Sequence, residues 1–312
     1  MFGNQPIRIG MTVPQIFYPE QVDTTLISSF VTRAETLGFE SLWVQERIIG
    51  GVNSLEPINL LSYVSALTQT IKLGTSVLVA STRNPIMLAK ELTTLDHLSN
   101  GRLIVGIGLG GRVEQYHLFG APSEHRVRFF MESIRVLKSL WEQPEAHFHG
   151  SYWELDGEQM NPKPVQAPHP PIWIGGIHPN VLRRSAKYGD GWMGNGNSST
   201  NQFRSQVEIL TQALEEEGRD LQNFQISKRV YIGVDNDENK AKRRMADYFS
   251  NHYGVNPERA GEVSITGNTE QCVDLLSDVV HAGAQMLMLN PAYDYLEQME
   301  ILAEEVIPKL TS

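Results

Sequence analysis

The sequence predicts an α/β protein, a (β/α)8 TIM barrel in which eight parallel strands alternate with eight helices, with insertions after strands 4 and 7. Short apolar, β-branched segments alternate eight times with longer segments whose apolar residues recur at helical spacing. A barrel of this kind needs about 250 residues, and the chain has 312. No change of composition marks a linker between domains. We therefore expect one barrel domain over residues 1–312, with right-handed crossovers.

The strands are expected where short apolar runs are bounded by glycine, proline or polar residues. These runs lie at residues 7–13, 41–44, 72–80, 102–108, 171–176, 191–195, 224–234 and 285–290. The helices are expected between them, where apolar residues recur three or four positions apart. These segments lie at residues 23–38, 58–70, 85–99, 126–141, 181–189, 202–218, 270–283 and 295–310. Typical end residues support the assignment, such as Asp23 before the first helix and Pro85 opening the third.

Two segments exceed the length of an ordinary barrel loop. Residues 142–170 are rich in proline and histidine, and residues 235–266 follow the seventh strand. Connections of this length without regular structure are uncommon inside compact domains. We expect both to be excursions from the barrel that roof a substrate pocket.

Composition excludes several classes of function. A net charge of −10 argues against non-specific nucleic-acid binding, which needs a basic surface. Cys272 is the only cysteine, so no intramolecular disulfide or thiolate metal cluster is expected. The first residues lack the pattern of a signal peptide, and no apolar run approaches the roughly 18 residues of a membrane span. We expect a cytoplasmic protein that does not contact membranes.

The stretch "GRLIVGIGLGG" contains Gly106, Gly108 and Gly111 at the spacing of a dinucleotide-binding turn. That fingerprint normally belongs to the first strand–helix turn of its domain, with an acidic residue about 20 positions later at a strand end. Here the glycines follow the fourth expected strand, and Glu132 lies inside an expected helix. The context argues against a nicotinamide-binding Rossmann domain.

Four segments carry a resemblance to a known family. They are "GFESLWVQER", "IKLGTSVLVASTRNPIMLAKELTTLDHLSNGRLIVGIGLGG", "PKPVQAPHPPIWIGG" and "GDGWMGN". In this order they resemble the bacterial luciferase-like monooxygenase superfamily, in particular its branch of coenzyme F420-dependent oxidoreductases. The resemblance implies a TIM barrel that holds reduced FMN or F420 at its mouth, where the strands end. It also implies a small-molecule substrate and, from the habit of the family, a homodimer.

The expected cofactor site combines three parts of this mouth. Gly175 and Gly176 end the fifth strand, and the helix that opens near Pro179 offers free N–H groups to a phosphate. His178 and Asn180 belong to the same turn, and Gly108 ends the fourth strand. The resemblance further implies that the third strand bulges beneath the cofactor ring through a non-proline cis peptide, which we expect between Ser76 and Val77. A regular buried strand and plain turns are the alternatives.

The expected catalytic residues are Glu46, Arg47 and His117. Many F420-dependent relatives have an acid–histidine pair where this chain has Glu46 and Arg47. Because arginine stays charged, Arg47 can stabilise an anion but cannot shuttle a proton, and a salt bridge to Glu46 is its alternative. His117 is therefore the preferred proton-transfer residue, with packing against a helix as its alternative. Gly111 stands where sugar-phosphate-oxidising relatives have a glutamate, which argues against that reaction.

The predicted function is F420-dependent hydride transfer to or from a small organic substrate. One alternative is an FMN-dependent monooxygenase supplied with reduced flavin by a separate reductase, and another is a non-catalytic flavin-binding barrel. No metal site is expected, because the His147–His149 pair supplies only two of the ligands that a site needs. Asp96 and Arg102 fit the family pattern at the far end of the barrel, where we expect a structural ion pair.

Overall fold

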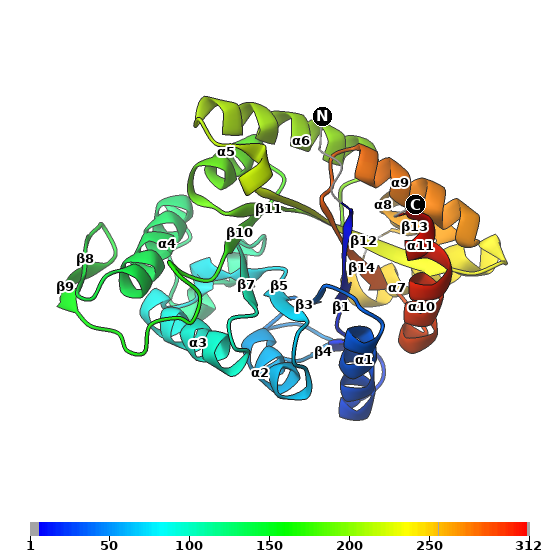
Figure 1. The fold of residues 1–312 in the computed structure, drawn as a ribbon, viewed down its shortest axis with the longest axis horizontal. Coiled ribbons are helices and arrows are strands. Elements are labelled where there is room, and N and C mark those ends of the chain that lie inside the picture. Colours follow the sequence, from blue (N-terminus) through cyan, green and yellow to red (C-terminus); the bar gives the residue numbers. More distant parts are fainter. Residues whose placement is uncertain (1–5, 255, 311–312) are drawn as a thin grey trace.

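The computed structural model describes residues 6–254 and 256–310. Within them, eight parallel strands close into a barrel surrounded by helices (Figure 1). The ring closes because the last strand pairs with the first and the fourth pairs with the fifth. The predicted fold class is therefore confirmed. In ring order the strands are β1 (Arg8–Thr12), β3 (Ser41–Val44), β5 (Lys72–Thr75), β7 (Leu103–Gly108), β10 (Ile172–Gly175), β11 (Gly191–Gly194), β12 (Gln225–Val234) and β14 (Met286–Pro291).

The helices follow the strands as the sequence predicts. Polar caps fix many of their starts: Asp23 accepts a hydrogen bond from the backbone of Leu26, and Asn84 accepts one from Ile86. The helices around the barrel are α1 (Thr24–Thr36), α2 (Pro57–Leu67), α3 (Pro85–Leu98), α4 (Arg126–Glu142), α5 (Pro179–Tyr188), α6 (Thr200–Glu216), α9 (Thr269–His281) and α10 (Tyr295–Ile301). The chain continues through a π-helical turn (Leu302–Val306) into α11 (Ile307–Leu310).

The inside of the barrel is filled by large side chains. Trp43 and Trp173 pack with their ring centroids 5.3 Å apart, and both are buried. Glycines in the neighbouring strands make room for them: a Cβ atom on Gly74 would lie 2.2 Å from the Trp43 ring. This interior is a packed core, so the strand ends are left as the place for a ligand.

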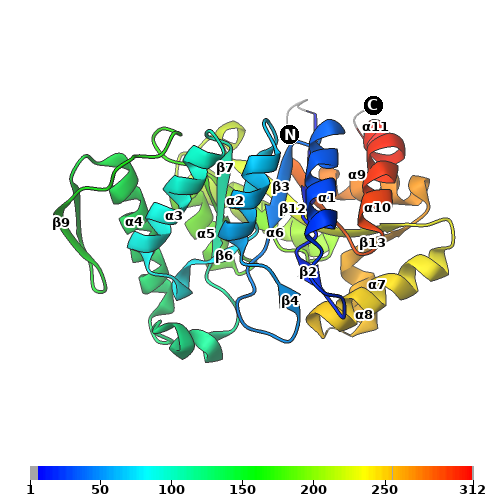
Figure 2. The ribbon, with the colours of Figure 1, turned by 90° about the horizontal axis from the view of Figure 1, so that it is seen from below.

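Residues 142–170 form an excursion, but not a roof over the mouth. The hairpin of β8 (Ala146–His149) and β9 (Glu154–Glu158) lies on the outer side of α4 in both Figures 1 and 2. Farther along, Gln166 donates a hydrogen bond to the carbonyl of Leu103, where β7 starts. The expectation that this segment covers the substrate pocket is wrong, because the chain leaves α4 at the end of the barrel opposite the mouth.

The insertion after strand 7 is confirmed and lies at the mouth. It contains α7 (Glu238–Tyr253), α8 (Pro257–Val263) and β13 (Ser264–Gly267), which pairs with β12. Short strands β2 (Ile16–Phe17) and β4 (Asn53–Ser54), in the loops after β1 and β3, pair with each other. Figure 2 shows β4, α7 and α8 at the same end of the molecule. None of the described helices is long and apolar enough to span a membrane.

The predicted ion pair between Asp96 and Arg102 is wrong. Asp96 is buried and accepts hydrogen bonds from the backbone and side-chain amides of Gln166. Arg102 instead donates to Thr68 Oγ1 and to the carbonyls of residues 65, 68, 71 and 99. Both residues do stabilise the end of the barrel opposite the mouth, as expected, but through separate partners.

Candidate active site

Two adjoining cavities lie at the mouth. The deeper one has an empty volume of about 350 Å³ and is lined by residues that include Ser76 and Arg229. The outer one has an empty volume of about 1000 Å³ and is lined by the loops after β3 and β7 and by Tyr253. Ile16 and Gln45 line both cavities. Ligand sites of enzymes on this fold lie at the same end of the barrel.

The third strand is interrupted where the family resemblance implies a bulge. β5 ends at Thr75, the peptide bond between Ser76 and Val77 is cis, and the chain then forms β6 (Leu78–Val79) beside β7. Val77 packs between two strand ends, because a Cβ atom on Gly108 or Gly175 would lie 2.8 or 2.7 Å from its methyl groups. The structure thus brings Ser76, Val77, Gly108 and Gly175 together. Glycine is required at positions 108 and 175 because Val77 fills the space that a side chain there would occupy.

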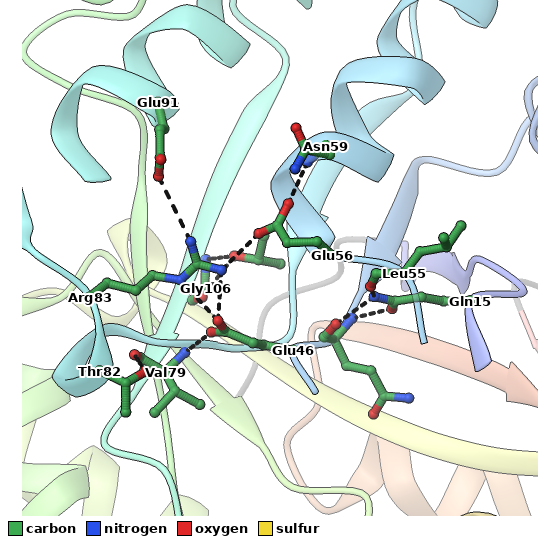
Figure 3. A network of polar contacts seen from close by, with 12 residues as sticks. Gln15, Glu46, Leu55, Glu56, Asn59, Val79, Thr82, Arg83, Glu91 and Gly106 are labelled. Atoms are coloured by element: carbon green, nitrogen blue, oxygen red, sulfur yellow. Dashed lines mark hydrogen bonds and ion pairs between the residues drawn. The ribbon is translucent and has the colours of Figure 1, made fainter. Parts of the chain in front are cut away.

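Glu46 lines the outer cavity, and both of its carboxylate oxygens are taken up by partners within the protein (Figure 3). One carboxylate oxygen accepts a hydrogen bond from the backbone of Val79, and the other accepts Arg83 Nε and Nη2 at 2.9 and 2.6 Å. The Glu46 side chain is 2% exposed, and Arg83 also pairs with Glu56 at 2.7 Å. Glu46 therefore anchors the segment that follows the cis peptide, and the alternative salt bridge from Glu46 to Arg47 does not form.

Arg47 lines the outer cavity without a carboxylate partner. Its Nη1 donates to the backbone carbonyl of His252 at 2.7 Å, and its guanidinium lies 5.6 Å from the ring centroid of Tyr253. Within residues 6–254 and 256–310, no carboxylate forms an ion pair with it. Its charge is therefore available to an anionic group bound in the cavity.

Arg229 is a second mouth cation that sequence reasoning missed. It is 8% exposed, donates from Nη1 to Gln45 Oε1 at 3.1 Å and from Nη2 to Asn290, and its Nε has no hydrogen-bond partner in the described structure. A buried charge without a carboxylate is costly unless a ligand compensates it. The signal was present in "ISKRVYIGV", where two cations interrupt an otherwise apolar buried strand.

The neighbouring Lys228 points to the other face of β12. Its Nζ donates to the backbone carbonyls of Asn195 and Ser198 in the loop after β11. Burial lowers the pKa of Lys228 to about 7. Lys228 therefore fixes the shape of the loop that follows β11 and does not line either mouth cavity.

The turn from β10 into α5 is the place where we expect the phosphate of the cofactor to bind. Gly176 has a φ of +148°, and its carbonyl accepts a hydrogen bond from Trp192 Nε1 at 2.8 Å. His178 caps α5, since its Nδ1 accepts the backbone N–H of Asn180 at 3.1 Å. His178 and Asn180 are exposed and Gly176 is half-buried, so the turn is open to a ligand. In this structure His178 therefore serves as the N-terminal cap of α5.

His117 lines neither of the two mouth cavities. It is exposed on the helical turn Val113–Phe119, whereas Gln115, Tyr116 and Phe119 of the same turn line the outer cavity. His147 and His149 are also exposed, and the described residues hold no cluster of three metal-ligating side chains.

A parallel barrel with a broken third strand and a mouth lined by unpaired cations defines an α/β-barrel enzyme of the kind that binds its ligand beyond the strand ends. The profile of the luciferase-like monooxygenase family matches residues 19–286, so the chain belongs to this family. The resemblance inferred from sequence is confirmed.

Individual relatives and solved structures are also similar to this chain. The chain is 28% identical to an F420-dependent glucose-6-phosphate dehydrogenase of Kineococcus radiotolerans, over 76% of this chain and 71% of the relative. It is 25% identical to an FMNH2-dependent dimethylsulfone monooxygenase of Pseudomonas putida, over 87% and 77% of the two chains. A solved F420-dependent secondary alcohol dehydrogenase has a TM-score of 0.86 with 19% identity, covering 99% of this chain and all of that one, and shows the shared fold.

Proposed function

We propose that the protein is an oxidoreductase that binds F420 across the barrel mouth and transfers hydride to or from a small organic substrate. The observation that carries the proposal is the buried Arg229 guanidinium, whose Nε is left without a partner at the floor of the mouth. Such a group fits a polar, electron-rich ring that accepts a hydrogen bond there. The names of the relatives support the choice of a deazaflavin or flavin.

Several of the predicted residues have a place in this proposal. Ser76 and Val77 would support the ring, and the turn of Gly175, Gly176 and Asn180 would hold the phosphate. When bound, F420 supplies the carrier of a hydride. The protein positions it, keeps water from it and sets the local charge. The family resemblance also supports a cytoplasmic homodimer.

The phosphate seat can be tested with a matched pair of variants. Asn180→Asp places a carboxylate on the first turn of α5, where the helix dipole favours it, so the fold should not suffer. Repulsion of the phosphate should weaken F420 binding about tenfold or more in a fluorescence titration. Asn201→Asp is the control, because Asn201 holds the same place on α6 and bonds Arg204 as Asn180 bonds Arg183.

Equal affinities of Asn180→Asp and the wild type would contradict the seat. Gly176→Asp is unsuitable for this purpose, since a side chain at a φ of +148° would also collide with Val181.

FMN is the second candidate cofactor, favoured by the FMNH2-dependent relative, which is 25% identical over 87% of this chain. To distinguish F420 from FMN, the purified protein is titrated with each reduced cofactor and the consumption of oxygen is measured. Oxygen uptake with reduced FMN would favour a monooxygenase reaction over hydride transfer. A separate reductase would then supply the reduced flavin. Turnover of any substrate would exclude the non-catalytic alternative.

A further inference from the structure

Tyr253 brings a phenol from the inserted helix α7 to the mouth. Its side chain lines the outer cavity, beside Arg47 and opposite the loop that follows β7. The Tyr253 hydroxyl donates to Gln45 Oε1 at 3.3 Å and accepts a hydrogen bond from the Tyr231 hydroxyl at 3.1 Å. A titratable oxygen is therefore held in place between the two cavities that share Gln45.

The charges that face this phenol are cationic. The Arg47 guanidinium lies 5.6 Å from the Tyr253 ring, and Arg229 donates to the same Gln45 oxygen at 3.1 Å. The other titratable groups around it are Tyr231 on β12, Tyr248 and His252 on α7, and Tyr295 at the start of α10. None of the described residues that contact the Tyr253 hydroxyl or ring is a carboxylate.

The surroundings distinguish Tyr253 from the tyrosines beside it. Burial opposes ionisation of its phenol, but the charge of Arg229 and the hydrogen bond that Tyr231 donates outweigh burial, so the pKa of Tyr253 lies below the usual 10.0. Burial raises the pKa of Tyr231 and of Tyr248 well above that value. Burial also lowers the pKa of His252, which is therefore neutral near pH 7. Among these three phenols, Tyr253 is the one that ionises first as the pH rises.

We propose that Tyr253 is the proton-transfer residue of the mouth, in the role that a histidine at position 47 would otherwise fill. The proposal rests on the proposed hydride-transfer function. In the oxidising direction an alcohol gives its O–H proton to the Tyr253 phenolate. Its C–H bond breaks with the electron pair leaving as hydride to oxidised deazaflavin, and the C–O bond becomes a carbonyl. In the reducing direction the phenol returns the proton to the carbonyl oxygen as hydride arrives at carbon.

The first test needs no cofactor or substrate. The near-ultraviolet absorbance of tyrosinate is followed while the wild-type protein is titrated with base. One phenol should ionise below the ordinary tyrosine pKa of 10.0, and this step should vanish in Tyr253→Phe. The control Tyr63→Phe changes an exposed tyrosine on α2 and should keep the step. Absence of the early step in the wild type, or its survival in Tyr253→Phe, would overturn the proposal.

The second test measures turnover of the wild type and the two variants with F420 and an alcohol–carbonyl pair. Tyr253→Phe should lower kcat about 100-fold or more, the usual share of general acid–base catalysis. Its Kd for F420 should stay within about twofold of the wild type, because the ring and its packing are kept. A kcat within a few-fold of the wild type overturns the role of Tyr253. If the wild type fails to bind F420, the proposed function falls, and the cofactor-free titration still decides whether Tyr253 is the acidic phenol.

Discussion

At the scale of single residues, the negative and the positive side chains at the mouth differ in whether they have a partner of opposite charge. Glu46 is buried and neutralised by Arg83, which also pairs with Glu56. Arg47 and Arg229 have no carboxylate partner among the described residues. The negative charge near the mouth is thus used for structure, and the positive charge is left for ligands.

Glu46→Gln should reveal this structural role. The amide keeps the shape of the side chain but loses the charge that pairs with Arg83 and one of the acceptor oxygens. We expect the free energy of unfolding to fall by about 2 kcal/mol, because Arg83 loses one of its carboxylate partners and either Arg83 or the backbone N–H of Val79 loses an acceptor. Chemical denaturation measures the change.

The control for Glu46→Gln is Glu262→Gln. Glu262 forms a 2.7 Å pair with Arg259 on the surface, with 62% of its side chain exposed. Exposed pairs contribute between about 0 and 1 kcal/mol. Equal losses in the two variants would show that Glu46 does not anchor the bulge.

The sequence could place Glu46 and Arg47 at the mouth, because residues that follow a barrel strand lie there. It could not predict their partners. Arg83 is 37 positions from Glu46, and His252 is 205 positions from Arg47. The same reason hid Arg229 and Tyr253, since only the closed barrel shows that β12 and α7 meet the end of β3.

At the scale of elements, short polar contacts join one strand–helix unit to the next. Glu35 near the end of α1 accepts hydrogen bonds from the backbone amides of Gln69, Thr70 and Ile71, just before β5. The bonds are 2.9, 2.6 and 2.9 Å long. Burial opposes ionisation of Glu35, but these bonds outweigh it and hold its pKa below the usual 4.5.

This contact predicts a pH-dependent stability. A folded-state pKa below the unfolded value means that Glu35 stabilises the fold fully above pH 4.5 and loses that contribution as the pH falls through the folded pKa. Glu35→Gln should therefore cost about 1 kcal/mol at pH 7, and the difference from the wild type should shrink in acid. Unfolding by denaturant at several pH values measures it. A difference that does not change with pH would contradict the role of the carboxylate.

Most helices and strands could be predicted from the sequence. The end of the barrel at which residues 142–170 lie was predicted wrongly. Caps such as Asp23 and prolines such as Pro85 mark helix starts through local chemistry. The segment 142–170 was expected to cover the mouth because it is long. It follows a helix, however, and a helix that runs antiparallel to the strands returns the chain to the end where strands begin. This rule would have placed the segment correctly.

At the scale of the whole molecule, the two ends of the barrel differ in how completely their buried arginines are hydrogen-bonded. Arg102 at the strand-start end makes five hydrogen bonds, four of them to backbone carbonyls around the end of α2 and α3. Arg229 at the mouth leaves its Nε unpaired. The barrel separates a face that stabilises the fold from one that carries the ligand site.

Arg102→Met and Arg229→Met test this division with the same substitution at opposite ends. Arg102→Met leaves several carbonyls without their donor, so we expect a loss of about 3 kcal/mol or more in the free energy of unfolding. Arg229→Met removes a buried charge that has no counter-ion, and that relief offsets part of the loss of its bonds to Gln45 and Asn290. Its loss of stability should be less than about half as large.

Binding should show the opposite order. F420 affinity should fall about tenfold or more in Arg229→Met, because the bound ring loses its buried donor, and should stay within about twofold of the wild type in Arg102→Met. Thermal or chemical unfolding and a cofactor titration give both quantities for each variant. If Arg229→Met destabilises the fold as much as Arg102→Met and leaves cofactor affinity unchanged, the mouth arginine belongs to the structural core, and the ligand must bind elsewhere on the barrel.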